Sequence, residues 1–279
     1  MLDEIRWGHY AGVGPHDRDN KVLKVLNWNI GRGIRVTGVM EVIDREQPDI
    51  CIFQEVDLNT RRSGWRNLPD ILAARFEFNY AFGVEYEELS QESENRRAFH
   101  GQAVLCRTQI GASRVLRFSG QSGFWYPRWY VPCLAMFQRR RGGRMALVTE
   151  LALDHTALVI YNLHLESRGS GKLRLLQLSE VVRDSLRYPN DTPVVVAGDL
   201  NTGDAASPLR SCLLTAGFRD ASGGGPRGGT TPTGRTLDWI FVRGPIACAE
   251  TKVHRWTSAS DHYPLSTILS LVDRPSPTS

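Results

Sequence analysis

The sequence predicts an α/β (α+β) fold in which two packed mixed β-sheets are flanked by helices. Apolar, strand-like runs are the commonest pattern along the 279 residues, and helical stripes are few. Several of these runs follow one another with no helix between them, which argues against a purely parallel sheet with crossover helices. This series of elements is typical of two stacked sheets with helices outside, built as one domain.

The expected elements follow from hydrophobic periodicity and from the positions of proline and glycine. Helices are predicted at 37–47, 65–76, 172–186 and 207–217. The third has an apolar stripe at helical spacing, and the fourth has proline at its first position. Strands are predicted at 22–28, 49–54, 78–84, 101–107, 131–138, 144–152, 156–165, 194–197, 237–242, 248–256 and 263–272.

Residues 21–272 are expected to form the single domain. Residues 1–20 are predicted to be a poorly structured lead-in, and residues 273–279 a flexible tail. The first residues contain no apolar stretch typical of a secretory signal, and no window reaches the apolar length of a membrane span. We therefore expect a cytoplasmic protein without an integral membrane segment, and we take it to be a monomer.

Charge and cysteine content exclude some classes of protein. The formal net charge is +4, which permits binding to polyanions without requiring it. The five cysteines lie far apart with no CxxC pair, at Cys51, Cys106, Cys133, Cys212 and Cys248. A scattered, odd set argues against a disulfide framework and against a zinc site.

The stretch VVVAGDLNTGD, at 194–204, ends a very apolar run with polar groups. Such a run is typical of a strand covered on both faces. Because side chains alternate along a strand, Asp199 and Asn201 are expected to point the same way at the rim of the core. This indicates a site, although glycine, aspartate and asparagine are also common in ordinary turns.

Other predicted strand ends also carry carboxylate, amide or imidazole groups. They supply Asn29, Glu55, Asn162, His164, Glu166, Ser167, Asp238, Asp261 and His262. Each has an ordinary interpretation, such as a turn, an ion pair or a satisfied core histidine, but these do not account for the repetition. Buried carboxylates are costly unless they are paired or bound to a metal. Several acidic residues with no lysine in their motifs therefore predict a hard divalent cation with oxygen ligands.

Taken in order, the motifs resemble those of the endonuclease/exonuclease/phosphatase superfamily of metal-dependent phosphoesterases, which has the DNase I-like fold. They are NWNIGRG, FQEVD, HGQAVLCR, NLHLES, GDLNT, TLDWIFV and SDHYPL, and they extend over about residues 22–272. The resemblance implies a four-layer sandwich with two central sheets, helices outside and the site at one end. It also implies phosphodiester hydrolysis with Mg²⁺, Mn²⁺ being the alternative cofactor.

The same resemblance implies a set of metal ligands. Glu55 corresponds to the principal Mg²⁺ ligand, and Asn29 lies beside it. Asp261, in the motif SDHYPL, completes the shell.

The resemblance also implies the catalytic roles. His262 corresponds to the histidine that handles the attacking water, and Asp238 to the residue that orients its ring. Asp199 corresponds to the aspartate that activates or positions the nucleophile, and Asn201 to the amide that steadies it and the phosphoryl oxygens. His164 corresponds to a second histidine that stabilises the charge developing on the phosphate. Whether Asp199 or His262 is the base stays open.

The substrate is less constrained by the sequence. NLHLES followed by Arg174 and Gln177 is similar to the pattern of tyrosyl-DNA phosphodiesterases, and this similarity implies that Ser167 contacts phosphate. DNA or RNA is the leading substrate, so the protein is expected to be a nuclease. A phospholipid, sphingomyelin or another small phosphoester is the first alternative. A non-catalytic, phosphate-binding scaffold is the second, because a fold does not guarantee activity.

Three segments bear on substrate binding. In SGFWYPRWYVP, at 122–132, Trp125 and Arg128 are expected to bind substrate by stacking on single-stranded nucleic acid. A lip that touches lipid and simple core packing are the alternatives. QRRRGGR, at 138–144, is predicted to be a solvated hairpin tip, or a phosphate-binding patch if it reaches the site. GVEYEELSQESE, at 83–94, is predicted to be a solvated acidic loop.

Overall fold

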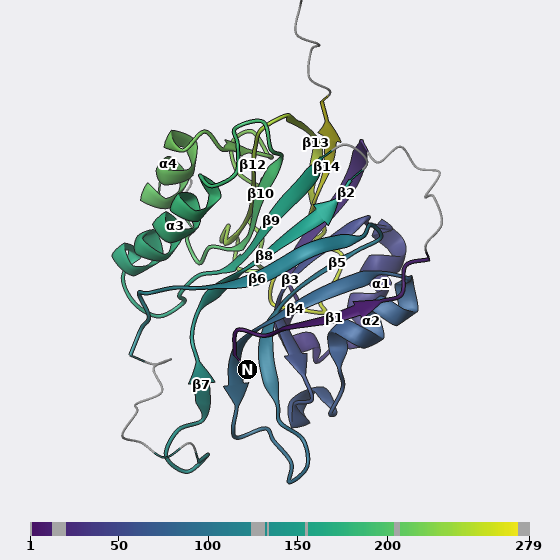
Figure 1. The fold of residues 1–279 in the computed structure, drawn as a ribbon, viewed down its shortest axis with the longest axis vertical. Helices are drawn as coiled ribbons and strands as arrows, with labels where there is room; N and C mark the ends of the chain where they lie inside the picture. Colours follow the sequence, from purple (N-terminus) through teal and green to yellow (C-terminus); the bar gives the residue numbers. More distant parts are fainter. Residues whose placement is uncertain are drawn as a thin grey trace, which may run out of the picture.

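The computed structural model describes residues 2–12, 21–123, 132, 134–153, 156–203 and 207–272. In this part of the chain, two β-sheets lie face to face between two pairs of helices (Figure 1). Figure 1 shows α3 and α4 on one side of the sheets and α1 and α2 on the opposite side. The predicted fold class is therefore confirmed.

The larger sheet contains eight strands in the order β1-β4-β5-β3-β2-β14-β13, with β7 paired to β4. The neighbours β2 and β3 are parallel, whereas the other pairs are antiparallel, so this sheet is mixed. The bounds are β1 Ile5–His9, β2 Val22–Asn29, β3 Ile50–Leu58, β4 Asn79–Glu88, β5 Phe99–Cys106, β7 Arg140–Gly142, β13 Ile246–Val253 and β14 Leu265–Leu271.

The smaller sheet contains six strands in the order β11-β12-β10-β9-β8-β6. Its strands β9 and β10 are parallel, and its other pairs are antiparallel. The bounds are β6 Ile110–Arg117, β8 Met145–Ala152, β9 Ala157–His164, β10 Val194–Asp199, β11 Arg219–Asp220 and β12 Asp238–Arg243.

Four α-helices cover the outer faces of the sheets: α1 Val36–Glu46, α2 Leu68–Phe76, α3 Gly171–Ser185 and α4 Pro208–Thr215. The buried side chains form three clusters, one between α1, α2 and the larger sheet, one between the sheets, and one between the smaller sheet and α3 and α4. These three clusters separate four layers. None of the described helices is long and apolar enough to cross a membrane.

The N-terminal segment departs from the prediction of a poorly structured lead-in. Residues Ile5–His9 form β1 and pair antiparallel with β4. The segment IRWGH lacks the regular alternation of a half-buried strand. Its strand conformation therefore depends on pairing with β4 and could not be predicted from its own sequence.

Two other predictions between residues 107 and 144 are also wrong. Residues 134–138 form a bend and a turn instead of the strand expected at 131–138. Arg140–Gly142 do not form the tip of a hairpin, because they make β7 and pair with β4. The sequence analysis also missed β6, at Ile110–Arg117.

The acidic run at 83–94 is not a solvated loop. Its first half belongs to β4, and Glu85, Glu87 and Glu88 are at most 1% exposed. Arginines from elsewhere in the chain pair with all three, and the nearest carboxylate–guanidinium contacts involve Arg144, Arg97 and Arg62 respectively. Arg62 and Arg144 are distant in sequence from their partners, so the local charge pattern contained no sign of them, whereas Arg97 lies only ten residues after Glu87.

Three buried amides connect the two sheets close to the predicted site. Gln54 Nε2 of β3 donates to Asn27 Oδ1 of β2 at 2.9 Å and to Asn162 Oδ1 of β9 at 2.8 Å. Asn162 Nδ2 donates back to the backbone oxygens of Phe53 and Ala103. Because each partner is fully buried, these directional bonds fix the alignment of the sheets where their strands end.

Candidate active site

The predicted strand-end residues meet at one end of the sandwich. In the smaller sheet, Asp199 at the end of β10 lies opposite His164 on β9 and Asp238 on β12. In the larger sheet, β2 ends at Asn29, and Glu55 lies in the neighbouring β3. Asn29 Nδ2 donates to Asp199 Oδ2 at 3.3 Å, so the ends of the two sheets meet at these side chains.

The end of β10 depends on a glycine. At Gly198 the φ angle is 147°, and a Cβ atom there would lie 1.9 Å from the backbone oxygen of Leu163. Only glycine permits this close approach of β10 to β9. Asn201, with φ of 49°, turns the chain after the strand and donates from Nδ2 to Leu165 O at 3.0 Å. Asn201 therefore joins the ends of these two strands.

His262 and Asp238 form a buried pair. His262 Nδ1 lies 2.8 Å from Asp238 Oδ2. Two further hydrogen bonds hold the backbone of His262, because Trp28 Nε1 donates to its oxygen at 2.8 Å and its N–H donates to Ser260 Oγ at 3.2 Å. Burial alone would lower the pKa of His262, but the carboxylate of Asp238, helped by that of Asp199, raises it to about 10.

Asp199 lies at the centre of the cluster. The Nε2 atoms of His164 and His262 are each 3.7 Å from its Oδ2 atom. Its Oδ1 accepts a hydrogen bond from the backbone N–H of Asn201 at 2.9 Å. Burial raises the pKa of Asp199 to about 7, because the cost of removing the carboxylate from water outweighs the opposing charge of His262.

His164 lies beside Glu85, which was not predicted from the sequence as a residue of the site. Its Nδ1 is 3.7 Å from Glu85 Oε2, and neither of these buried atoms has a hydrogen-bond partner. Burial, with the nearby charge of Arg144, holds the pKa of His164 well below its usual value. The one available sign of Glu85 was its place in the strand pattern, and the strand predicted at 78–84 ended one residue too early.

Glu55 and Asn29 lie together beside this cluster. Asn29 Nδ2 is 3.5 Å from Glu55 Oε1, and Asn29 Oδ1 accepts from the N–H of Gly31 at 3.1 Å. The pairing of β3 with β5 shifts register between Phe53 and Val56, and Glu55 has φ of 50°. Such a bulge aims a side chain away from the regular alternation. The side chain of Glu55 keeps 24% exposure.

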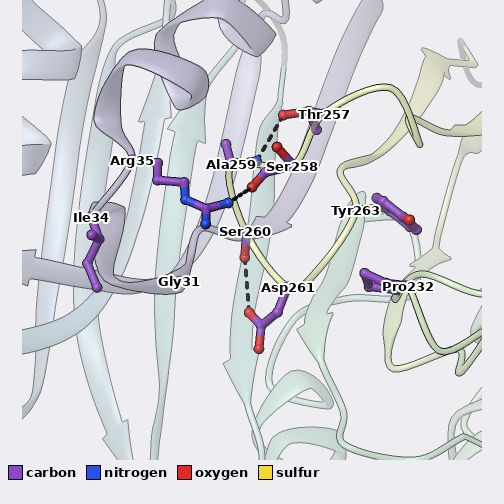
Figure 2. Close-up of a pocket in the computed structure, with 10 residues that line it drawn as sticks. All are labelled: Gly31, Ile34, Arg35, Pro232, Thr257, Ser258, Ala259, Ser260, Asp261 and Tyr263. Carbon is purple, nitrogen blue, oxygen red and sulfur yellow. Dashed lines mark hydrogen bonds between the residues drawn. The ribbon is translucent and has the colours of Figure 1, made fainter.

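A groove of about 500 Å³ opens beside Asp261 (Figure 2). In Figure 2, Ile34 and Arg35 stand across it from Pro232 and Tyr263. The exposed Asp261 lines this groove, and its Oδ1 accepts from the hydroxyl of the preceding serine at 3.3 Å. Glu55 lines a different cavity, so the participation of Asp261 in a metal shell stays a prediction.

The predicted phosphate contact lies in a supported loop. Ser167, which follows β9, is exposed, and its Oγ accepts from Arg144 Nη2 at 3.3 Å. Helix α3 holds this loop, since Arg174 Nη1 donates to Glu166 O at 3.2 Å and Gln177 Oε1 accepts from Glu166 N at 3.0 Å. Arg174 and Gln177 thus support the loop of Ser167, and the phosphate contact of Ser167 stays a prediction.

The other two predicted substrate-binding residues cannot be placed in the site. Trp125 and Arg128 lie outside the described residues. Of the segment 122–132, only residues 122, 123 and 132 belong to the described part of the chain. Their substrate role stays a prediction.

The donor atoms of the site fit a divalent cation. Asp199, Asp238 and His262 each offer a ligand atom, and these atoms lie within 4.8 Å of one another. Asp238 Oδ1 is buried without a hydrogen-bond partner. Glu55 and Asn29 add carboxylate and amide oxygens, the ligands that Mg²⁺ prefers. Arg32 Nε lies 3.7 Å from Glu55 Oε2, but among the described residues Asp199 and Asp238 form ion pairs only with histidines, and one imidazolium balances the charge of only one of these two buried carboxylates.

Comparisons with known proteins agree with this geometry. The sequence matches the model of the Endonuclease/Exonuclease/phosphatase family over residues 26–262. No curated protein matches it.

Solved structures share the fold at low sequence identity. An endonuclease/exonuclease/phosphatase from Beutenbergia cavernae is 20% identical with a TM-score of 0.68, and 92% of this chain and 73% of that chain are covered. The human Nocturnin catalytic domain with bound sulfate is 16% identical with a TM-score of 0.68, covering 97% and 98%. A humanized D. rerio TDP2 is 18% identical with a TM-score of 0.62, covering 90% and 99%.

At these identities the structures show the fold alone, whereas the family model spans most of the sequence. The resemblance inferred from the motifs is confirmed. The chain belongs to the endonuclease/exonuclease/phosphatase family.

Proposed function

We propose that this protein is a divalent-metal-dependent phosphodiesterase that hydrolyses phosphodiester bonds in DNA or RNA. The observation that carries the proposal is the surroundings of Asp199. Two histidines lie 3.7 Å from one of its oxygens, one of them held by Asp238, and Asn29 bridges toward Glu55. Membership of the family supports phosphoester chemistry for such a site.

Glu55 and Asn29 would hold the cation, with Asp261 as a third ligand. Mg²⁺ is the expected ion and Mn²⁺ the alternative, because the donors are oxygens. When bound, the cation supplies Lewis-acid polarisation of a non-bridging phosphoryl oxygen.

The side chains around Asp199 are arranged to move a proton. Asp238 fixes the ring of His262 so that Nε2 faces Asp199, and both groups are in position to take the proton of an attacking water. Asn201 holds Asp199 through its backbone N–H and steadies the nucleophile with its amide. Because the raised pKa of His262 keeps its ring protonated near neutral pH, the proton acceptor is Asp199, or His262 once it has passed its own proton to Asp199.

His164 has a different task. Its buried imidazole is held neutral, with Nδ1 toward Glu85 and Nε2 toward Asp199. An Nε2–H group there donates a hydrogen bond to a phosphoryl oxygen as negative charge develops. Ser167, three residues after His164, adds a hydroxyl to the cavity that His164 also lines.

We call His164, Asp199, Asp238 and His262 the catalytic cluster. Nucleic acid is the proposed substrate because arginines lie beside this cluster. Arg32, Arg140, Arg144 and Arg168 line the cavity that contains Glu55 and His164. Guanidinium groups are well suited to binding the phosphates of a strand. The similarity of the NLHLES motif to tyrosyl-DNA phosphodiesterases favours the same class.

One observation favours a phospholipid as the alternative substrate. Leu134, Met136 and Phe137 are 56%, 81% and 56% exposed, a concentration of apolar surface next to a positively charged strand. Apolar side chains flanked by arginine are also typical of segments that bind a membrane surface. Hydrolysis of liposomes distinguishes this class from a nuclease.

The test is cleavage of labelled single- and double-stranded DNA and RNA oligonucleotides with Mg²⁺, with Mn²⁺ and with EDTA. Asp199→Asn removes the central carboxylate and keeps its shape. Asp44→Asn, on the exposed face of α1, is the matched control. We expect metal-dependent cleavage by the wild type and by Asp44→Asn that disappears in Asp199→Asn. Absence of cleavage of all strands, with hydrolysis of liposomes, would replace nucleic acid by phospholipid.

A further inference from the structure

A cavity lined by arginines lies on the side of the site formed by β3, β4 and β7. Its volume is about 140 Å³. We call it the arginine pocket; its lining residues are Arg32, Glu55, Tyr86, His100, Arg140, Arg144, His164, Ser167 and Arg168. It shares Glu55, His164 and Ser167 with the proposed catalytic centre, whereas Asp199, Asp238 and His262 do not line it. The arginine pocket therefore flanks the position of the scissile phosphate.

Buried carboxylates fix two of the guanidinium groups. Arg144 Nη1 donates to Glu85 Oε1 at 2.6 Å, and both side chains are at most 3% exposed. Arg140 Nε donates to Glu88 Oε1 at 2.9 Å, and the guanidinium lies 4.9 Å from the centre of the Tyr86 ring. Glu85 and Glu88 lie behind the cavity and do not line it.

A second set of contacts makes the floor of the pocket rigid. Arg62 pairs with both oxygens of Asp57 and reaches Glu88 Oε1 at 2.8 Å. Asp57 Oδ1 lies 2.7 Å from His100 Nδ1, and the His100 ring stacks on Tyr86 with 4.6 Å between centroids. Arg140 and Arg144 are thus held in position before a ligand arrives, which reduces the entropy lost on binding.

The lining presents four guanidinium groups and a single carboxylate. That carboxylate belongs to Glu55, which we propose as the metal ligand and whose Oε2 lies 3.7 Å from Arg32 Nε, so guanidinium groups remain in excess in the lining. Ligand pockets for larger molecules measure about 300–1,000 Å³, whereas this one has room for a compact anion. A tetrahedral phosphate suits the size and the donors, because guanidinium N–H groups bind phosphate oxygens in pairs.

We infer that the arginine pocket binds a second phosphate group of the substrate, next to the phosphate held at the catalytic centre. This inference rests on the proposed function and narrows its substrate class. The preferred substrates carry two neighbouring phosphates, as a nucleic acid strand does, and an isolated phosphodiester binds more weakly. The second phosphate is either the next phosphodiester of the strand or a terminal phosphate, and both have the same chemistry.

The test compares substrates that differ only in the second phosphate. Dinucleotides with no terminal phosphate, with a 5′-phosphate and with a 3′-phosphate are hydrolysed by the wild type, by Arg140→Gln/Arg168→Gln and by Arg139→Gln. Arg139 is exposed, adjoins Arg140 and does not line the pocket, so its variant is the matched control. The readout is the ratio of kcat/KM with and without the extra phosphate.

We expect one phosphorylated dinucleotide to be favoured by the wild type by about tenfold or more, the usual effect of charge-assisted hydrogen bonds. The ratio should fall close to one in Arg140→Gln/Arg168→Gln and persist in Arg139→Gln. If the preferred second phosphate is internal, a trinucleotide without terminal phosphate shows the same dependence. Wild-type ratios near one for all these substrates would overturn the inference, as would an equal loss on every substrate in the double variant.

Binding measurements distinguish a failure of the proposed function from a failure of the inference about the arginine pocket. If the wild type hydrolyses no dinucleotide, affinities of the same dinucleotides are measured by calorimetry on the wild type and both variants. Tighter binding of a phosphorylated or longer strand that depends on Arg140 and Arg168 would support the pocket without the activity. Equal binding of all ligands would overturn the pocket as well.

Discussion

The catalytic cluster and the floor of the arginine pocket both bury carboxylates, but they balance the charge in different ways. In the floor, each carboxylate contacts at least one arginine, in the pairs Asp57–Arg62, Glu85–Arg144, Glu88–Arg62 and Glu88–Arg140. In the catalytic cluster, Asp199 and Asp238 face imidazole rings instead. The comparison teaches that arginine pairing builds a scaffold, whereas the carboxylates without an arginine partner are the ones that we propose, together with Glu55, for cation binding and reaction.

The largest expected effect is loss of activity when the catalytic cluster is changed. Asp199→Asn should reduce kcat by about 10²–10⁴, the range for removing a positioned proton-transfer group. Its melting temperature should equal or exceed that of the wild type, because the variant removes a buried carboxylate that no arginine balances. Cleavage kinetics and a thermal melt check both statements, and substantial residual activity would contradict the role of Asp199.

Changing the floor of the arginine pocket should lower the stability of the protein, in contrast to the change at Asp199. Arg62→Met leaves Asp57 and Glu88 with fewer partners in a buried region, and breaking such pairs costs about 3–5 kcal/mol of unfolding free energy. Urea denaturation measures the effect. The control is Lys252→Met, at a fully exposed ion pair with Glu250, where no measurable change is expected. A small loss in Arg62→Met would mean that the floor is not a structural network.

Adding Mg²⁺ should stabilise the protein through the site at Glu55 and not through the floor of the arginine pocket. At a Mg²⁺ concentration a hundred times its dissociation constant, the free energy of unfolding should rise by about 2.7 kcal/mol. The rise should be absent in Glu55→Gln and retained in Arg62→Met, since the floor is balanced without a cation. Denaturation with Mg²⁺ and with EDTA provides the measurement, and an equal response of both variants would argue against Glu55 as the principal ligand.

The smallest expected effect concerns Asp261. This residue is exposed and lines the groove of Figure 2, so its charge is well screened. In Asp261→Asn the Mg²⁺ concentration for half-maximal activity should rise by roughly two- to fivefold, the scale of an exposed charge interaction. A much larger shift would mean that Asp261 contributes as strongly as the principal ligand, and no shift would remove it from the metal shell.

The sequence was most informative where a local pattern coincides with the site. Apolar runs of β2, β9 and β10 end at Asn29, His164 and Asp199, and the resemblance to the family implied that these ends share one site. The four-layer order also follows, because strands without crossover helices favour two sheets. The meeting of these strand ends was therefore anticipated from the sequence, while the catalytic roles of their residues stay a proposal.

The sequence was least informative where partners are distant in the chain. Glu85 and Glu88 read as solvated because their neighbours are acidic, and the arginines that bury them come from residues 62, 140 and 144. Strand β7 was read as a hairpin tip for the same reason, since its pairing with β4 spans more than fifty residues. Long-range pairing overrides local propensity in both cases.

The most direct test of the central claim is a calorimetric titration of Mg²⁺ into metal-free protein, with Glu55→Gln and Arg62→Met alongside. The account predicts saturable binding to the wild type and to Arg62→Met, and its loss in Glu55→Gln. Absence of binding to the wild type, or binding that Glu55→Gln leaves unchanged, would contradict the claim that Glu55 is the principal ligand of a cation site.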